Sequence, residues 1–233
     1  MDLESHALFL RMLRRQKRRY ANRIYAWTGM SNHHHIFQEA PTVWHEETHF
    51  AREQKRLNKP IPVGHMLCDT MAAFCRNLNL QKKKEGATVK DRCKLVRVFG
   101  DRHALVLLIY IFLNPVRSGQ VSHPKDYPHT NFLQYSESKF QFDYLFDFHP
   151  SYLRLGDSPA QRQARFNYLI NEAMKGWGAC KWPGASASHC IGRNKGREAI
   201  DDFCKVTQDW CDQFSWLTEE TFAAPEKPTN FYP

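Results

Sequence analysis

The chain has 233 residues, 42% of them hydrophobic, which is enough for one domain with a sizeable core, with or without an appendage. Its 33 lysines and arginines outnumber 24 aspartates and glutamates, and the formal charge of +9 favours an anionic partner such as nucleic acid. The longest apolar run, Ala104 to Leu113, is about half of what spans a bilayer, which argues against a membrane protein.

The cysteines and the N-terminal region indicate a compartment. Seven cysteines are present, an odd number without a C-x-x-C pair, and no secretory signal is recognisable. Free thiols of this kind are typical of a reducing environment. We therefore expect a cytoplasmic protein.

Residues 3–20 have apolar side chains at helical spacing and six basic residues in the second half. These basic residues could contact phosphate or simply be solvated near the C-terminus of the helix. A strand is predicted over Ile24–Trp27, followed by His33, His34 and His35. In a strand, His33 and His35 share one face and His34 points the other way. Two such imidazoles could bind one metal ion with a third ligand, whereas the alternative is a solvated polar turn.

The segment His45-Glu46-x-x-His49 matches the H-E-x-x-H signature, in which two histidines bind zinc and the glutamate acts as a general base. The residues that follow are strongly polar, whereas a zinc-protease helix buries one face. The extended form of the signature is also absent. This motif therefore predicts a zinc protease only as a remote alternative.

A helix is predicted over residues 65–80, and a strand over 95–100 with basic residues beside it. Those basic residues suit a nucleic-acid surface or a solvated sheet edge equally. Asp101 can cap the next helix, and Pro115 predicts that this helix ends near Asn114. Tyr110 and Asn114 then share one face of its last turn. A core tyrosine and a C-terminal cap are the alternative roles.

The remainder of the chain is predicted to be loop-like over 120–150. A helix follows that starts at Ser158-Pro159 and runs through Ile170. Residues 176–196 are rich in glycine and serine. A last amphipathic helix over 200–217 precedes a loose, proline-rich tail.

Three blocks of this sequence, in the same order, resemble the single-tyrosine HUH transposases, specifically the REP-associated tyrosine transposase-like branch. The first block, residues 25–35, contains Met-x-Asn-His-x-His. The second, residues 110–119, follows the pattern Tyr-Ile-x-x-Asn-Pro-Val-Arg-x-Gly. The third starts at His149-Pro150 and continues through Gly156. Each block is short, but their order strengthens the resemblance.

The resemblance implies an α+β fold with a ferredoxin-like antiparallel sheet, helices on one face, and a mostly helical C-terminal extension. The catalytic core is expected over residues 1–135, the extension over 136–222 and the loose tail over 223–233. Family members usually carry an additional strand with an Arg-Gly pair before the first helix. The core of this chain is expected to lack that strand, or to fill its place with another segment.

The resemblance also implies roles for particular residues. His33 and His35 match the metal ligands, Asn114 the third ligand through its amide oxygen, and Tyr110 the catalytic tyrosine. The expected metal is Mg²⁺ or Mn²⁺. The expected partner is single-stranded or hairpin DNA, and relatives include both dimers and monomers, so a homodimer is compatible. Phosphate contacts are expected from Arg92, Lys94, Arg97 and Arg117.

The function predicted on this basis is a metal-dependent transposase or endonuclease of the bacterial cytoplasm. It would cleave and rejoin single-stranded DNA through a covalent phosphotyrosine, at hairpin-forming repeats. One alternative is a domesticated or inactive DNA-binding protein that retains the HUH fold. The remote alternative is the zinc protease through His45, Glu46 and His49.

Overall fold

The computed structural model describes residues 2–40, 64–86, 88–89, 98 and 100–176. Strands β1 (Arg23–Gly29) and β2 (His34–Glu39) form an antiparallel two-stranded sheet. The helical elements are α1 (Leu3–Tyr20), α3 (His65–Lys82), α4 (Gly100–Arg117), the 3-10 helix η1 (Pro124–Asp126), α5 (Phe132–Glu137), α6 (Pro150–Leu153) and α7 (Pro159–Gly176). The predicted mixture of helices and strands is therefore confirmed.

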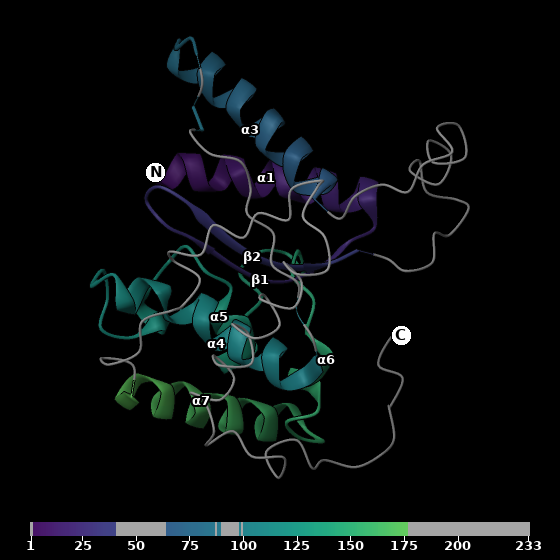
Figure 1. The fold of residues 1–233 in the computed structure, drawn as a ribbon, viewed down its shortest axis with the longest axis vertical. Helices are drawn as coiled ribbons and strands as arrows, with labels where there is room; N and C mark the ends of the chain where they lie inside the picture. The colour runs from purple at the N-terminus through teal and green to yellow at the C-terminus, as the bar shows by residue number, and fades with distance from the viewer. Residues whose placement is uncertain (1, 41–63, 87, 90–97, 99, 177–233) are drawn as a thin grey trace, which may run out of the picture.

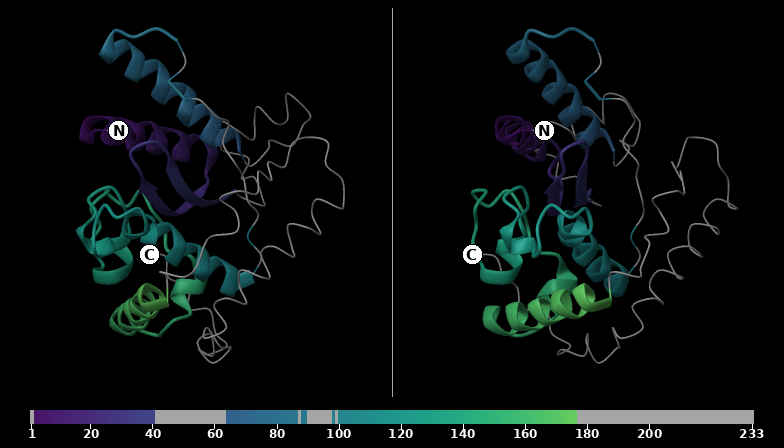
Figure 2. Two further views of the ribbon diagram at one scale, coloured as in Figure 1. Left: turned by 60° about the vertical axis from the view of Figure 1, so that its left-hand side comes forward. Right: turned by 90° about the vertical axis from the view of Figure 1, so that its left-hand side faces the viewer.

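The hairpin lies between two layers of helices. Helix α1 covers one face with α3 packed against α1, and α4 to α7 lie on the other side (Figures 1 and 2). The resemblance implied helices on one face of the sheet, whereas in the described residues helices lie on both sides. The reason is visible in β1, where every residue after Arg23 is buried and both faces need cover.

A β-bulge distributes the side chains of β1 between these two layers. Ile24 pairs with Gln38 but Ala26 pairs with Phe37, so the register shifts at the intervening residue. Ile24 and Trp27 join the apolar cluster of α1 and α3. Tyr25 and Ala26, which lie between these two residues in the sequence, join the cluster of α4, α5 and α7 instead. The bulge thus lets one short strand contribute two residues to each core.

Helix α1 has the bounds predicted from its apolar periodicity. Asp2 caps its start by accepting a hydrogen bond from the backbone N–H of Ser5 at 2.8 Å. The helix ends at Ala21, which adopts a left-handed conformation with φ 52°. Its buried side chains, including Phe9 and Leu13, pack toward the hairpin and α3.

Helix α4 differs from the sequence prediction, because it continues past Pro115 to Arg117. Proline lacks an N–H and so removes one helical hydrogen bond. That loss is tolerated here because the end is closed just beyond it: the N–H of Gly119 donates to the carbonyl of Val116 at 2.9 Å, and Gly119 has φ 71°. The extra turn places Arg117 on the same face as Tyr110 and Asn114.

The edge of β1 opposite β2 is partly covered by residues 129–131. The N–H of Gly29 donates to the carbonyl of His129 at 2.9 Å, and Thr28 and Thr130 form an isolated antiparallel bridge. The side chain of Asn131 accepts from the N–H of Trp27 at 2.8 Å and donates to the carbonyl of residue 25 at 3.0 Å. A segment distant in the sequence thus provides hydrogen bonds that a further strand would supply.

Several predicted elements lie outside the described residues. These are nearly all of the predicted strand at 95–100, the H-E-x-x-H segment, the Gly/Ser-rich stretch, the last helix and the tail. The expected division between residues 135 and 136 stays a prediction; it falls within α5. None of the helices in the described ranges has the length and hydrophobicity needed to cross a bilayer.

Candidate active site

The three consecutive histidines lie at the turn between the strands and at the start of β2, rather than in a continuation of β1. The N–H of Met30 donates to the carbonyl of His33 at 2.8 Å and closes this turn. The Nε2 atoms of His33 and His35 lie 2.9 Å apart. His34 points to the opposite face, as the alternation of a strand predicts.

His34 is held in place by its neighbours on the α1 side. Its Nδ1 accepts a hydrogen bond from Nε1 of Trp27 at 3.1 Å. Its ring stacks on Phe9 with centroids 3.8 Å apart and an angle of 12° between the planes. His34 therefore packs against the apolar cluster of that layer.

Helix α4 brings Tyr110 to the face that His33 and His35 occupy. The rings of His35 and Tyr110 have centroids 5.5 Å apart and stand nearly perpendicular, at 86°. The guanidinium carbon of Arg117 lies 5.3 Å from the centroid of the Tyr110 ring. Tyr110 is 8% exposed, so its ring is packed between these groups.

Asn114 lies one helical turn after Tyr110 and is also buried. Its amide Nδ2 donates to the backbone carbonyl of Tyr110 at 2.9 Å. This hydrogen bond fixes the orientation of the amide, and the oxygen is the atom that could act as a metal ligand. The same hydrogen bond is also what a purely structural role near the helix end would require.

Burial and charge set the protonation states of the site. Burial raises the pKa of Tyr110, while the charge of Arg117 and hydrogen bonds with Asn114 and Arg117 act in the opposite direction. Burial, reinforced by His33 and Arg117, lowers the pKa of His35 to about 3. Burial also lowers the pKa of His33. Both imidazoles are therefore neutral at neutral pH, which is the form that binds metal ions.

Asn32 is a site residue that the sequence analysis did not single out. Its Oδ1 lies 2.6 Å from Nδ1 of His33 and accepts a hydrogen bond from it. This contact fixes the proton of His33 on Nδ1 and leaves the lone pair of Nε2 directed toward His35. The signal that could have revealed it was an amide residue directly before the first histidine of the Met-x-Asn-His-x-His block.

The donor set fits a divalent ion. Two ligand atoms that each lie about 2.1 Å from one ion, at a right angle, are roughly 3 Å apart. The Nε2 atoms of His33 and His35 meet this condition at 2.9 Å. Within the described ranges no group of three or more His, Cys, Asp or Glu side chains is placed to hold a metal ion. A metal bound at the two histidines would therefore need a further ligand, and the resemblance assigns that role to the amide oxygen of Asn114.

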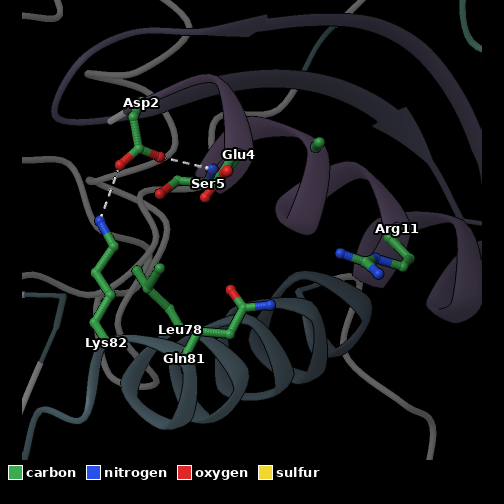
Figure 3. Close-up of a pocket in the computed structure, with 8 residues that line it drawn as sticks. Asp2, Glu4, Ser5, Arg11, Leu78, Gln81 and Lys82 are labelled. Atoms are coloured by element: carbon green, nitrogen blue, oxygen red, sulfur yellow. Dashed lines mark hydrogen bonds and ion pairs between the residues drawn. The ribbon is translucent and has the colours of Figure 1, made fainter.

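Among the predicted phosphate-binding residues, only Arg117 lies in the described part of the chain, and it contacts Tyr110. Arg92, Lys94 and Arg97 lie outside it, as do His45, Glu46 and His49 of the alternative zinc motif. A groove between the start of α1 and the end of α3 contains none of the predicted site residues (Figure 3). The candidate site is therefore the face shared by β2 and α4.

Comparison with protein-family models, curated proteins and solved structures gave no significant match.

Proposed function

We propose that the protein is a metal-dependent enzyme that cleaves and rejoins single-stranded DNA through a covalent bond to Tyr110. The proposal combines the three sequence blocks that resemble HUH transposases with the residues grouped on β2 and α4. The fold it implies is a ferredoxin-like core, of which β1, β2, α1 and α4 would be parts.

One observation carries the proposal. The two histidines of the first block and the tyrosine of the second are distant in the sequence, yet His35 and Tyr110 are in ring contact. His33 converges on His35 through Nε2, and Asn114 and Arg117 flank Tyr110 on α4. This is the arrangement that a phosphotyrosine mechanism requires: a nucleophile beside a set of metal ligands and a cation.

The chemistry would proceed from the hydroxyl of Tyr110. Its oxygen attacks the phosphorus of a DNA phosphodiester, forms a phosphotyrosine bond and displaces the 3′ oxygen, which takes up the proton that the phenol loses. Arg117, whose charge favours the phenolate, supports this loss of the proton. Held by His33, His35 and Asn114, Mg²⁺ or Mn²⁺ would supply Lewis-acid chemistry at a phosphate oxygen.

The reverse reaction explains rejoining. The phosphotyrosine retains the energy of the broken phosphodiester, so a 3′-hydroxyl from another strand can attack it and release Tyr110. No nucleotide cofactor is required for this exchange. Hairpin-forming repeats are the proposed substrates, because the sequence blocks resemble the branch associated with such repeats.

The test is a trapping assay with hairpin-bearing single-stranded DNA labelled at its 3′ end and Mn²⁺. The wild-type protein should form a covalent adduct that survives denaturing electrophoresis, because Tyr110 becomes attached to the 5′ phosphate of the labelled fragment. Tyr110→Phe should form none. Tyr168→Phe, which removes the hydroxyl of an exposed tyrosine on α7, should form as much adduct as wild type.

A second candidate function is DNA binding without cleavage. The observation that favours it is the burial of Tyr110, which raises the pKa of the phenol and limits access to it. If the wild-type protein binds the hairpin DNA but gives no adduct with Mn²⁺ or Mg²⁺, the enzymatic proposal is wrong and the binding function is retained.

A further inference from the structure

The six basic residues in the second half of α1 fall into two sets. Three of them are paired with carboxylates of the same chain: Arg14 with Asp143 at 3.1 Å, Lys17 with Asp147 at 2.6 Å and Arg19 with Asp69 at 3.3 Å. The other three form what we call the arginine stripe: Arg11, Arg15 and Arg18. The stripe is exposed, and within the described residues no ion pair joins it to a carboxylate.

The arginine stripe has a regular geometry. Its members are four and three residues apart, so they lie along one face of α1. At 1.5 Å per residue, the stripe extends about 10 Å along the helix. The stripe is therefore a row of three cations along which the phosphates of one strand can lie. Arg11 lies at the other end of the groove between α1 and α3 from the Asp2–Lys82 ion pair (Figure 3).

A second feature, which we call the aromatic turn, consists of residues 140–144. Tyr144 is 76% exposed and Phe140 38%, and their rings contact each other with centroids 4.8 Å apart and planes at 31°. Asp143 and Tyr144 both have positive φ, 46° and 57°, although neither is glycine. Such conformations are costly, and they are retained where the surrounding contacts enforce them.

Arg14 connects the two features. Its guanidinium donates to the carbonyl of Phe142 at 2.7 Å and pairs with Asp143 at 3.1 Å. Arg14 precedes Arg18 by four residues and follows Arg11 by three, so all three are neighbours on the surface of α1. The aromatic turn is therefore held beside the arginine stripe.

We propose that the arginine stripe and the aromatic turn form a second contact surface for single-stranded DNA. The stripe binds consecutive phosphates, and the exposed ring of Tyr144 stacks on a base. A row of cations beside an accessible aromatic ring is the combination that binds single strands without sequence preference. The inference rests on the proposed function only in taking DNA as the nucleic acid, because neither feature includes a residue of the candidate active site.

The experiment measures binding of fluorescein-labelled oligothymidylate by anisotropy over a series of salt concentrations, in a Tyr110→Phe background that prevents cleavage. Replacing Arg11, Arg15 and Arg18 by glutamine should reduce the slope of log K against log salt by about 2, since each phosphate contact on a single strand contributes about 0.7. The charge-matched control replaces Lys84, Lys125 and Lys175 by glutamine; all three are exposed and distant from the stripe in the sequence. This control should leave the slope nearly unchanged.

The aromatic turn is tested separately. Tyr144→Ala should weaken binding by about tenfold without changing the salt slope, because stacking is not ionic. Tyr144→Phe should restore the affinity, which a general loss of structure would not allow. The Tyr168→Ala variant removes another exposed tyrosine and serves as the control.

The proposal is overturned if the triple arginine variant and its lysine control show the same slope, or if Tyr144→Ala binds as tightly as its background. It is also overturned if the arginine stripe is needed for binding phosphatidylserine vesicles but not for binding the oligonucleotide. Because adduct formation is absent from this assay, failure of the Tyr110 chemistry would not affect the result, and failure here would not affect the trapping assay.

Discussion

Asp147 joins three parts of the structure, and its replacement is expected to be costly. One carboxylate oxygen, Oδ2, accepts from Nζ of Lys17 at 2.6 Å and from the N–H of Ile24 at 3.0 Å. Lys17 also donates to the carbonyl of Leu145 at 2.8 Å. The side chains of Lys17 and Asp147 are only 20% and 26% exposed. This contact therefore ties α1 and β1 to the segment that precedes α6.

The size of the effect follows from these contacts. Hydrogen bonds to charged groups contribute about 1.5–3 kcal/mol each, and Asp147→Ala removes two of them while leaving Lys17 partly buried without its carboxylate. Because both side chains are partly exposed, water replaces part of this loss, and we expect the free energy of unfolding to fall by about 2–4 kcal/mol and Tm by about 4–16 °C for a chain of this size. Asp147→Asn should cost about half as much, because the amide oxygen still accepts from Ile24.

Urea denaturation followed by circular dichroism measures these differences. The control is Asp143→Ala, since Asp143 also pairs with an arginine of α1 but has an 83% exposed side chain, and it should cost about 0–1 kcal/mol. A double-mutant cycle of Lys17→Met with Asp147→Asn should give a coupling of at least about 1 kcal/mol. Equal costs for Asp147→Ala and Asp143→Ala, or no coupling, would refute this account.

Three further predictions concern stability and metal binding. Stability should decrease as pH falls from about 6.5 to 4, because burial lowers the pKa of several histidines to about 4 in the folded chain while the unfolded chain still protonates them near 6.5. The histidines concerned are His6, His103 and His149. A free energy of unfolding that stays constant between pH 6.5 and 4, measured by urea titration at each pH, would contradict this. Gly29→Ala should lower the free energy of unfolding by about 1–3 kcal/mol in thermal denaturation, because the new Cβ would lie 2.6 Å from Nδ1 of buried His6. The control is Gly86→Ala, whose Cβ would have open space around it, so that only its positive φ costs stability. Asn32→Ala should weaken Mn²⁺ binding by about 10–100-fold in calorimetry, with Asn79→Ala unchanged.

Local patterns in the sequence predicted several helices correctly. Residues 3–20 and 65–80 show apolar side chains at helical spacing, and α1 and α3 occupy these ranges to within two residues. Pro159 indicated the start of α7 in the same way. The end of α4 was predicted wrongly, because the general effect of Pro115 is outweighed by a closed helix end at Gly119 that only the three-dimensional structure shows.

The non-local contacts could not be predicted from such patterns. The hairpin was missed because its turn, from Met30 to His33, lacks the Asn-Gly or Asp-Gly pair by which short turns are recognised. The cover that residues 129–131 give to β1 depends on chain segments far apart in sequence. In the site, strand alternation predicted the shared face of His33 and His35. The contact of Arg117 with Tyr110 could not be predicted, because it requires α4 to continue past Pro115.

The hydrogen bond from Trp27 to His34 also determines which imidazoles can meet Tyr110. Because strand side chains alternate, a slip of β2 by one residue would turn His34 toward α4 and send His33 and His35 into the layer of Phe9. In a run of three identical residues, the local sequence alone would hardly distinguish the two registers. The pairing of Trp27 with His34, together with the stacking on Phe9, makes them unequal. His34, which has no expected part in the chemistry, thus fixes the strand register that directs His33 and His35 toward α4.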